Sequence, residues 1–207
     1  MSTTFILFGF HNPRKDNSRS YLCSVKFLLF PFALIYGAAI RLRNLMFDLG
    51  VFRGHSFDVP VIAVGNLRVG GTGKTPAIIA LLAMVPSKFH LAVLSRGYGR
   101  STNGWFEVAT DSEADQTGDE PVLIKQSHPD ADVAVMENRV KGIERLLGKD
   151  PKPEVVLLDD AMQHRWVKPG HLILLTAYHQ RYSSDYLLPM GRLREHRSAA
   201  ARADTIL

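Results

Sequence analysis

The stretch VGNLRVGGTGKTP occupies residues 64–76 and directly follows an apolar run, VPVIA, at residues 59–63. An apolar strand that continues into GGTGKT and then into a helix-compatible segment is the layout of a phosphate-binding P-loop. The glycines allow the backbone to curl so that several N–H groups point at phosphate oxygens, and the following helix turns its positive end toward the same anion. The stretch therefore predicts a nucleotide-binding loop between a strand and a helix.

The predicted loop consists of Val69, Gly70, Gly71, Thr72, Gly73, Lys74 and Thr75. Lys74 would supply a cation near the β- and γ-phosphates, and the Thr75 hydroxyl would hold Mg²⁺. The full pattern G-x-x-x-x-G-K-[ST] requires glycine at the position that Arg68 occupies in this chain. A plain glycine-rich turn is the alternative interpretation, although such a turn has no use for Gly-Lys-Thr at the start of a helix.

The chain after residue 59 alternates apolar runs with helix-compatible segments. The runs lie at residues 59–64, 90–94, 132–136, 154–158 and 171–175, and the helix candidates lie at 75–85, 119–127 and 138–148. Short apolar strands between helices favour a parallel sheet that is covered on both faces. We therefore predict an α/β fold over residues 51–207, a P-loop NTPase-like, mostly parallel sheet with helices on both faces. Residues 204–207 resemble the start of another buried strand, so we expect that a C-terminal part of this domain is missing.

Two segments precede this domain. Residues 1–20 are largely polar and irregular, and we expect them to form a poorly ordered extension. Residues 21–50 contain the apolar run FLLFPFALIYGAAI, at 27–40, followed by Arg41 and Arg43. The run is shorter than the roughly 20 residues that span a bilayer, so we expect a membrane-associating helix that lies in the interface. A helix packed on the domain and a spanning helix are the alternatives.

Composition narrows the class of protein. A hydrophobic fraction of 46% with a charged fraction of 22% is ordinary for a folded domain. The single cysteine, Cys23, excludes a disulfide framework within the chain. The net charge of +5 would suit nucleic acid, an anionic membrane or phosphorylated substrates. Because the sequence has no basic stripe with interleaved aromatic residues, we expect an anionic membrane surface rather than nucleic acid. We also expect no obligatory protein partner, since none is evident in the sequence.

An acidic pair forms the second half of the predicted site. The run VVLL at 155–158 ends in Asp159 and Asp160. In P-loop proteins an acidic residue at such a strand end reaches the Mg²⁺ on the nucleotide phosphates. One carboxylate of the pair could serve the metal, while the other takes a proton from an attacking hydroxyl. A solvated acidic turn is the alternative.

Other polar residues follow predicted strands or open predicted helices. Arg96 and Arg100 close the strand at 90–94 and are candidate anion contacts, because carboxyl ends of strands face the ligand crevice in α/β sheets. A glycine turn with solvated arginines is the alternative. Asp119 opens a helix and is either an N-cap or a metal contact. His164, which follows the acidic pair, could orient an aspartate, contact substrate or cap the turn.

Five motifs in order resemble one family. They are VGNLRVGGTGKTP, LSRGYGR, GDEP, DDAMQHR and LLPMGRLRE. The last motif has arginines beside leucines, which suits either an amphiphilic anionic ligand or a generic surface loop. Together they resemble the tetraacyldisaccharide 4′-kinases, the lipid A 4′-kinases of Gram-negative bacteria, over roughly residues 25–207. The apolar segment that runs into RLRN and then into a VPVI strand is also similar to that family.

The resemblance implies an enzyme that uses ATP and Mg²⁺ to phosphorylate the 4′-hydroxyl of tetraacyldisaccharide 1-phosphate, a lipid A precursor, to give lipid IVA. It also implies a location at the cytoplasmic face of the bacterial inner membrane. Two other interpretations stay open. One is a catalytically incomplete fragment that binds nucleotide, because the family continues past Leu207 with further strands and an Asp-His-His segment. The other is a membrane-associated regulatory P-loop NTPase, which would hydrolyse nucleotide without a lipid acceptor.

The resemblance also implies roles for individual residues. Lys74 and Thr75 match positions that hold phosphates and Mg²⁺, and Asp160 matches the base for the 4′-hydroxyl. Asp119 and Glu120 match acidic positions tied to the metal, and Asp159 matches the metal-side member of the acidic pair. Gln163 and His164 match the DDGxQH motif, in which Ala161 replaces the glycine. Arg194 and Glu195 match the LRE motif. The candidate substrate contacts are therefore Arg96, Gln163, His164, Arg194 and Glu195. The loop of this family also generally lacks glycine at the position of Arg68.

Overall fold

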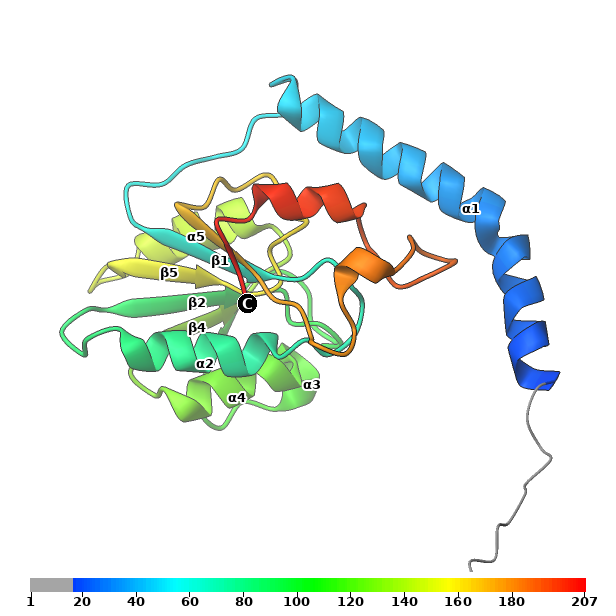
Figure 1. Cartoon of the computed structure of the whole chain (residues 1–207). Helices are drawn as coiled ribbons and strands as arrows, with labels where there is room; N and C mark the ends of the chain where they lie inside the picture. Colours follow the sequence, from blue (N-terminus) through cyan, green and yellow to red (C-terminus); the bar gives the residue numbers. More distant parts are fainter. Residues whose placement is uncertain (1–16) are drawn as a thin grey trace, which may run out of the picture.

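Across residues 17–207, the part of the chain that the computed structural model describes, seven strands form one sheet in the order β3-β4-β2-β5-β1-β6-β7 (Figure 1). The strands are β1 (Val61–Gly65), β2 (Leu91–Ser95), β3 (Phe106–Val108), β4 (Asp132–Val135), β5 (Val155–Leu158), β6 (His171–Leu174) and β7 (Thr205–Ile206). Strand β3 pairs antiparallel with β4, and every other neighbouring pair in this sheet is parallel.

The register of the central strands brings their carboxyl ends together. Ala63 of β1 and Leu94 of β2 both pair with Leu158 of β5, which lies between the two strands. On the other side of β1, Val64 pairs with Ile173 of β6. The ends of these strands therefore meet at one edge of the sheet, where ligands bind in open α/β folds.

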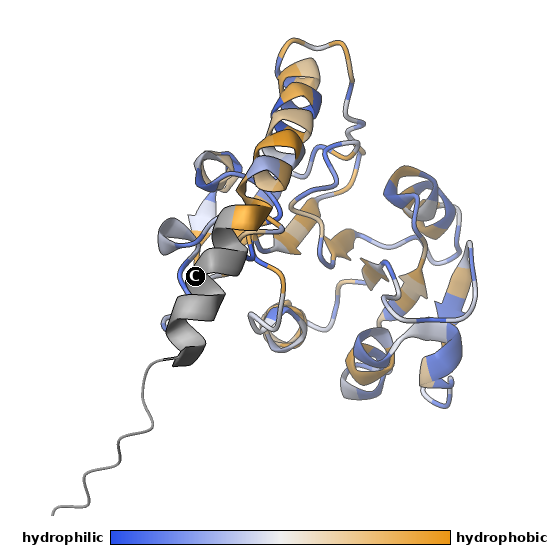
Figure 2. Ribbon diagram, turned by 90° about the vertical axis from the view of Figure 1, so that its right-hand side faces the viewer, coloured by the Kyte–Doolittle hydropathy of each residue, from blue (hydrophilic) through white to orange (hydrophobic). Residues whose placement is uncertain are grey.

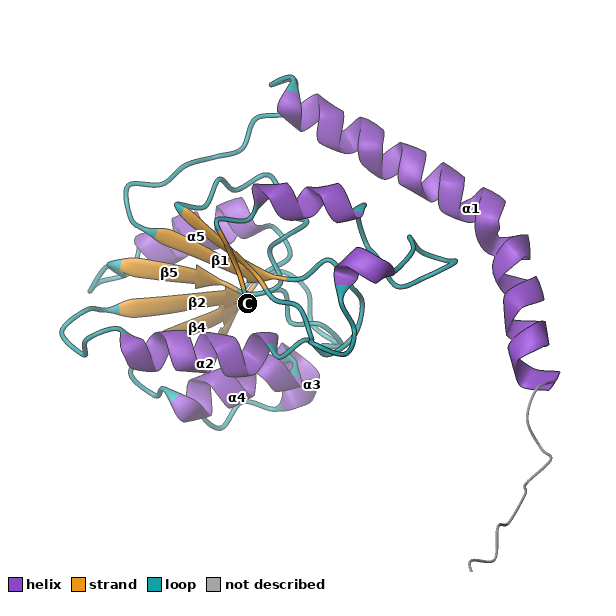
Figure 3. Ribbon diagram, viewed as in Figure 1, coloured by secondary structure: helices purple, strands orange, loops and turns teal. Residues whose placement is uncertain are grey.

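Helices cover both faces of the sheet (Figure 3). They are α2 (Lys74–Met84), α3 (Ala114–Thr117), α4 (Asp119–Ser127), α5 (Arg139–Leu147) and the 3₁₀ helices η1 (Tyr182–Ser184) and η2 (Arg197–Arg202). Ile78 of α2 and Ile124 of α4 belong to one buried cluster. Ile143 of α5 and Ala200 of η2 belong to the other. This arrangement confirms the predicted α/β fold with a mostly parallel sheet between two layers of helices.

The central strands are apolar throughout because both of their faces are buried. In β2, Leu91 and Val93 face the cluster under α2 and α4, whereas Ala92 and Leu94 face the cluster under α5. The alternation follows the two-residue period of a strand. Since each face meets a layer of helices, the strand appears in the sequence as a continuous apolar run.

A long helix, α1 (Asn17–Asp48), runs along one side of the molecule (Figure 1). It begins before residue 21, so the end of the segment 1–20, which was expected to be irregular, is helical; residues 1–16 lie outside the described residues. The section Leu28–Asp48 has 21 residues and contains an 18-residue window with a mean hydropathy of 1.3, of which 6% is buried, so it is long and apolar enough to cross a membrane. Figure 2 shows hydrophobic residues along this exposed helix as well as in the sheet.

The C-terminal half of α1 is attached to the α/β domain. The Tyr36 hydroxyl donates a hydrogen bond of 2.8 Å to the carbonyl oxygen of Arg194. Arg43 donates a bond of 2.8 Å to the carbonyl oxygen of Gln163. Both acceptors lie in motifs that the sequence analysis singled out, so the helix contacts the candidate site directly.

Candidate active site

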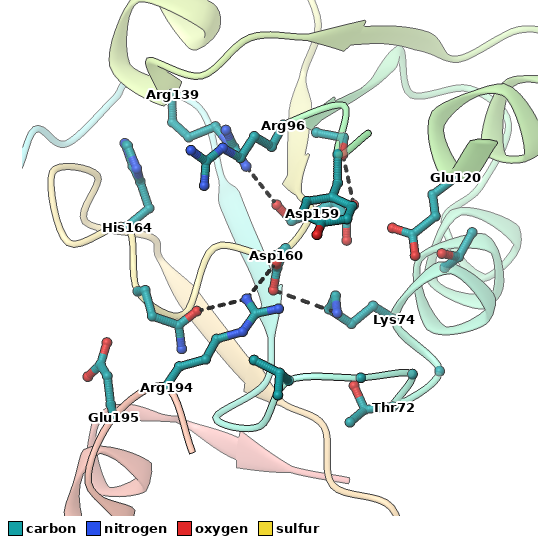
Figure 4. Close-up of a pocket in the computed structure, with 18 of the residues that line it drawn as sticks. Thr72, Lys74, Arg96, Glu120, Arg139, Asp159, Asp160, His164, Arg194 and Glu195 are labelled. Atoms are coloured by element: carbon teal, nitrogen blue, oxygen red, sulfur yellow. Dashed lines mark hydrogen bonds and ion pairs between the residues drawn. The ribbon is translucent and has the colours of Figure 1, made fainter. Parts of the chain in front are cut away.

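A cavity of about 1070 Å³ opens at the carboxyl ends of the central strands (Figure 4). Its lining includes the loop between β1 and α2, the ends of β2 and β5, and the segment around residue 194. Tyr36, Ile40 and Arg43 of α1 complete one wall. Because Glu120 of the GDEP motif also lines it, the cavity joins all five motifs to the apolar helix in one place.

The loop between β1 and α2 has the backbone shape that its glycines predict. Gly70 and Gly73 adopt φ angles of 113° and 79°, in the region that side chains disfavour. The buried Asn66 donates from Nδ2 to the Thr72 hydroxyl at 2.8 Å and to the Gly70 carbonyl at 3.5 Å. No side chain of the described residues caps the start of α2, so its first N–H groups are available to an anion. From Val69 to Thr75, every predicted loop residue lines the cavity.

Asp159 is a buried carboxylate at the end of β5. Only 1% of its surface is exposed, and the Ser95 hydroxyl donates to its Oδ2 at 2.8 Å. Burial, together with the negative charges of Glu120 and Asp160, raises the pKa of Asp159 to about 6. Its Oδ1 has no hydrogen-bond partner within residues 17–207. A buried carboxylate of this kind is ready to accept a positively charged ligand.

Asp160 lies between two cations. Its backbone has a left-handed φ of 49°, unlike any other non-glycine residue in the described part of the chain. Lys74 Nζ is 3.7 Å from Oδ1, and Arg194 donates to Oδ2 at 2.7 Å. The turn thus directs this carboxylate toward the phosphate-binding loop, while Asp159 faces Ser95 (Figure 4). The adjacent acids occupy different environments, as a division of roles requires.

Gln163 bonds to several parts of the site. Its Nε2 donates to the carbonyl oxygen of Asn66 at the base of the loop at 2.8 Å, and its Oε1 accepts a longer bond of 3.4 Å from Arg194. Its own carbonyl oxygen accepts the bond from Arg43 of α1. The side chain therefore links the loop, the acidic segment and Arg194.

His164 lines the same cavity as a neutral imidazole. Burial, together with the positive charges of Arg139, Arg43 and Arg96, lowers the pKa of His164 to about 4. Its Nε2 has no hydrogen-bond partner among the residues that the structure describes. At neutral pH it can accept or donate a hydrogen bond in the cavity without adding charge.

The structure separates the two arginines of LSRGYGR. Arg96 is exposed and lines the cavity, with no hydrogen bond or ion pair to the described residues. Arg100 instead pairs with Glu137 and donates to the carbonyl oxygen of Gly104 at 2.7 Å. Of the two, only Arg96 is therefore available for an anion in the cavity.

The structure also separates the two acids of GDEP. Glu120 lines the cavity, whereas Asp119, in the same first turn of α4, does not. The residue before the helix is Gly118, and no side chain in the described part of the chain caps this helix. Asp119 was expected to be either a metal contact or the N-cap of this helix. In the structure it lies neither on the cavity wall nor at the cap position.

The LRE motif lines the cavity beside α1. Glu195 has 0% of its surface exposed, and its Oε2 accepts bonds from Asn44 at 3.1 Å and from Arg202 at 2.7 Å. Arg194 is the residue that bonds to Asp160. The motif thus connects the acidic pair to α1 and to η2.

Several residues that line or build the site gave little signal in the sequence. Arg139 is 2% exposed and donates to the carbonyl oxygens of Met136 at 2.8 Å and Asp159 at 3.3 Å. Burial lowers the pKa of Arg139 to about 10, which leaves it charged. Tyr36 of α1 was hidden within an apolar run, although a tyrosine hydroxyl in such a run usually has a partner.

The donor set fits a magnesium ion that is shared with a nucleotide. Thr75, Glu120, Asp159 and Asp160 all line the cavity, and Oδ1 of each aspartate lacks a hydrogen-bond partner in residues 17–207. The described residues contain no cluster of three or more His, Cys, Asp or Glu side chains that could hold a metal by themselves. Mg²⁺ takes one or two carboxylates together with waters and substrate phosphates, and the carboxylates that line this cavity can supply that share of its ligands.

Comparison with known proteins agrees with this geometry. The family model described as tetraacyldisaccharide-1-P 4′-kinase matches residues 25–207. The tetraacyldisaccharide 4′-kinase of Flavobacterium psychrophilum is 51% identical over 179 residues, which cover 86% of this chain and 52% of that protein. The one from Bacteroides thetaiotaomicron is 51% identical over 180 residues, covering 86% of this chain and 47% of that protein. The chain thus spans about half the length of the curated relatives it matches.

A solved structure has the same fold. The crystal structure of the "apo" form of LpxK from Aquifex aeolicus in complex with ATP superposes with a TM-score of 0.81 at 36% sequence identity. The match covers 88% of this chain and 58% of that chain.

Proposed function

The chain belongs to the tetraacyldisaccharide-1-P 4′-kinase family, and we propose that its protein transfers the γ-phosphate of ATP to the 4′-hydroxyl of tetraacyldisaccharide 1-phosphate, forming lipid IVA in lipid A biosynthesis. The observation that carries this proposal is the meeting of a phosphate-binding loop and a carboxylate in one cavity. Lys74 at the end of the loop is 3.7 Å from Asp160, and both line that cavity. A kinase requires this proximity, because most of its rate comes from positioning and charge stabilisation.

The nucleotide side of the cavity would hold the ATP phosphates. The left-handed glycines and the uncapped start of α2 direct backbone N–H groups at an anion, and Lys74 adds a positive charge. The related LpxK structure from Aquifex aeolicus is a complex with ATP. In this chain Thr75, Asp159 and Glu120 would hold Mg²⁺, which when bound neutralises charge on the β- and γ-phosphate oxygens.

Asp160 would act as the general base. In the transfer, the 4′-oxygen forms a bond to the γ-phosphorus while the bond from that phosphorus to the β–γ bridging oxygen breaks. The proton of the hydroxyl passes to the Asp160 carboxylate. Its bond of 2.7 Å to Arg194 orients the carboxylate beside the loop. Arg96, exposed in the cavity wall, would contact an anionic group of the acceptor or the nucleotide.

The acceptor lipid would reach the cavity along α1. Leu28, Phe32 and Ile35 expose 73%, 59% and 70% of their surface, which provides an apolar face for acyl chains or a bilayer. The same helix lines the cavity through Tyr36 and Arg43. One helix would therefore contact both the bilayer and the cavity that contains the phosphate-binding loop.

The attachment of α1 supports an interfacial orientation of this helix, and we propose that it lies at the cytoplasmic face of the inner membrane. The apolar section Leu28–Asp48 is long enough to span a bilayer, but it is hydrogen-bonded to the domain through Tyr36 and Arg43. Arg165 adds an ion pair of 2.7 Å with Asp48 at the end of the helix. A helix held along this length on a polar domain cannot also lie wholly in hydrocarbon, where each unsatisfied polar group is costly. An interface rich in anionic lipid also suits the net charge of +5.

The proposal is tested by following ATP-dependent phosphorylation of tetraacyldisaccharide 1-phosphate by the full protein in mixed micelles. We expect Lys74→Ala to lower kcat/KM by at least about 10²-fold, because one preorganised charge at a developing anion is worth that much. Lys141→Ala on the exposed surface of α5 is the matched control and should behave as the wild type. No transfer by the wild type, or equal rates in both variants, would refute the kinase proposal. ATP hydrolysis that ignores the lipid would favour a regulatory NTPase instead.

A further inference from the structure

The first limb of the phosphate-binding loop, residues 67–69, is hydrogen-bonded to a distant segment of the chain. The Val69 N–H donates to the carbonyl oxygen of Arg192 at 2.8 Å, and the Arg194 N–H donates to the carbonyl oxygen of Leu67 at 2.8 Å. These bonds form an antiparallel bridge at Arg68. The limb therefore depends for its position on the segment that leads to the LRE motif.

The side chain of Arg68 reinforces this contact. Its Nε lies 2.7 Å from Asp185 Oδ2, and its NH1 donates to the carbonyl oxygen and the side chain of Gln180 at 3.1 and 2.9 Å. The two charged side chains are only 15% and 18% exposed. A shielded, multiply bonded guanidinium of this kind is stronger than an ordinary surface pair. Arg68 does not line the cavity, so it is not itself a phosphate contact.

Asp185 also uses its other carboxylate oxygen, Oδ1, to close the turn formed by residues 185–192, which leads to the LRE motif. Oδ1 accepts bonds from the backbone N–H of Tyr186 at 2.8 Å and of Arg192 at 3.4 Å. The turn is tight: a Cβ on Gly191 would overlap the Tyr186 carbonyl oxygen. The carboxylate of Asp185 thus holds both ends of this turn together and also contacts the guanidinium of Arg68.

We propose that Arg68 and Asp185 form a clamp that positions the phosphate-binding loop relative to the acceptor side of the cavity. The clamped segment continues directly into Arg194, which bonds to Asp160. The phosphate cradle and the carboxylate that faces it are therefore held by the same piece of chain. Both clamp residues are positioning residues, since they act on ATP only through the loop. This inference rests on the proposed function of the cavity as an ATP site.

The test compares Arg68→Ala, Asp185→Ala and the double variant of the full protein for ATP affinity, KM for ATP and kcat. We expect each single variant to raise the Kd and KM for ATP about ten-fold, which corresponds to about 1.4 kcal/mol. The double variant should lose no more than about the larger single effect, because the two side chains act as one unit. The matched control is Lys149→Ala, which removes ion pairs of 3.0 Å with Glu107 and 2.8 Å with Asp132 outside the cavity and should leave ATP affinity unchanged.

Conservative variants separate positioning from folding. Asp185→Asn keeps an oxygen for the backbone N–H groups but loses the charge, and Arg68→Lys keeps the charge but loses the bonding fork. Each should raise the KM for ATP with an unchanged circular dichroism spectrum, and these two variants decide the matter if the alanine variants do not fold. A KM equal to that of Lys149→Ala, or a double-variant loss equal to the product of the single losses, would overturn the clamp. If the wild type neither binds ATP nor phosphorylates the lipid, the proposed function fails; if it does both and the clamp variants match it, only the clamp fails.

Discussion

The contact between Asn44 and Glu195 distinguishes a helix that builds the site from one that only anchors the protein. Asn44 Nδ2 donates to Glu195 Oε2 at 3.1 Å, and Arg202 supplies the other bond to that oxygen at 2.7 Å. Glu195 has 0% of its surface exposed, and its Oε1 has no partner in the described part of the chain. The substitution Asn44→Ala therefore leaves a buried carboxylate with a single donor.

The expected cost follows from this geometry. A hydrogen bond to a charged group contributes about 1.5–3 kcal/mol to stability. The distance of 3.1 Å is long for a charge-assisted bond and the contact is only partly buried, so we expect about 1.5–2 kcal/mol. For a chain of this size 1 kcal/mol shifts the Tm by about 2–4 °C, which gives a fall of about 3–8 °C. Turnover should fall as well, because the same contact holds the LRE motif against the cavity.

The assay is thermal unfolding of the protein in detergent, with lipid phosphorylation measured on the same samples. Leu42→Ala is the matched control, since Leu42 lies on the same helix and is 58% exposed, and its change should stay within about 0.5 kcal/mol. A double-mutant cycle with Glu195→Ala should give a coupling energy of about 1 kcal/mol or more. The reasoning is refuted if Asn44→Ala is no more damaging than Leu42→Ala, or if the two substitutions at the contact are additive.

Three further outcomes are expected. Asp160→Asn should lower single-turnover phosphorylation by about 10²–10⁴-fold while changing the calorimetric Kd for ATP far less; an equal loss in both would argue against a base. Because the pKa of His164 is lowered to about 4 by burial, its contribution to stability is full above pH 6.5 and shrinks as the pH falls toward 4. We expect about 1 kcal/mol less stability at pH 5 than at pH 7 after allowance for solvent screening. Urea denaturation of His164→Gln should lack this part of the pH dependence, and an unchanged pH profile would contradict it. Replacing Leu28 and Ile35 by serine should weaken binding to anionic vesicles by at least about ten-fold, since burying each side chain is worth roughly 1.5–3 kcal/mol. Leu123→Ser on α4 should have no effect in the same sedimentation assay, and equal binding by both proteins would refute the interfacial helix.

Local periodicity explains how much of the fold could be predicted from the sequence. The helix predicted at 119–127 coincides with α4, the apolar run at 154–158 contains β5, and the run at 90–94 covers all of β2 except Ser95. In each of these elements, the pattern of apolar residues that identifies it is visible within a few consecutive residues. Strand β3 and helix η2 were not predicted, because β3 has three residues and η2 has six, too few for a period to be visible.

Contacts between distant segments explain what could not be predicted in the site. The loop and the acidic pair were recognised from residue types at fixed spacing, but the partners of Gln163 are set by tertiary structure. Its amide bonds to Asn66, 97 positions away, and its carbonyl oxygen bonds to Arg43, 120 positions away. The choice between Asp119 and Glu120 depends on the phase of α4, and successive helical residues point about 100° apart. A helix of nine residues with apolar positions on several sides does not reveal that phase in its sequence.

The backbone angles also explain why the loop tolerates Arg68 where the full P-loop pattern has glycine. Gly70 and Gly73 need to be glycine because of their φ angles of 113° and 79°, although a Cβ at either position would meet nothing within 4 Å. Arg68 is outside this left-handed region, since Asp160 is the non-glycine residue with positive φ in the part of the chain that the structure describes. The curl of the loop therefore makes no demand for glycine at this position. A side chain can be accommodated there, and in this protein it reaches the segment that carries Arg194.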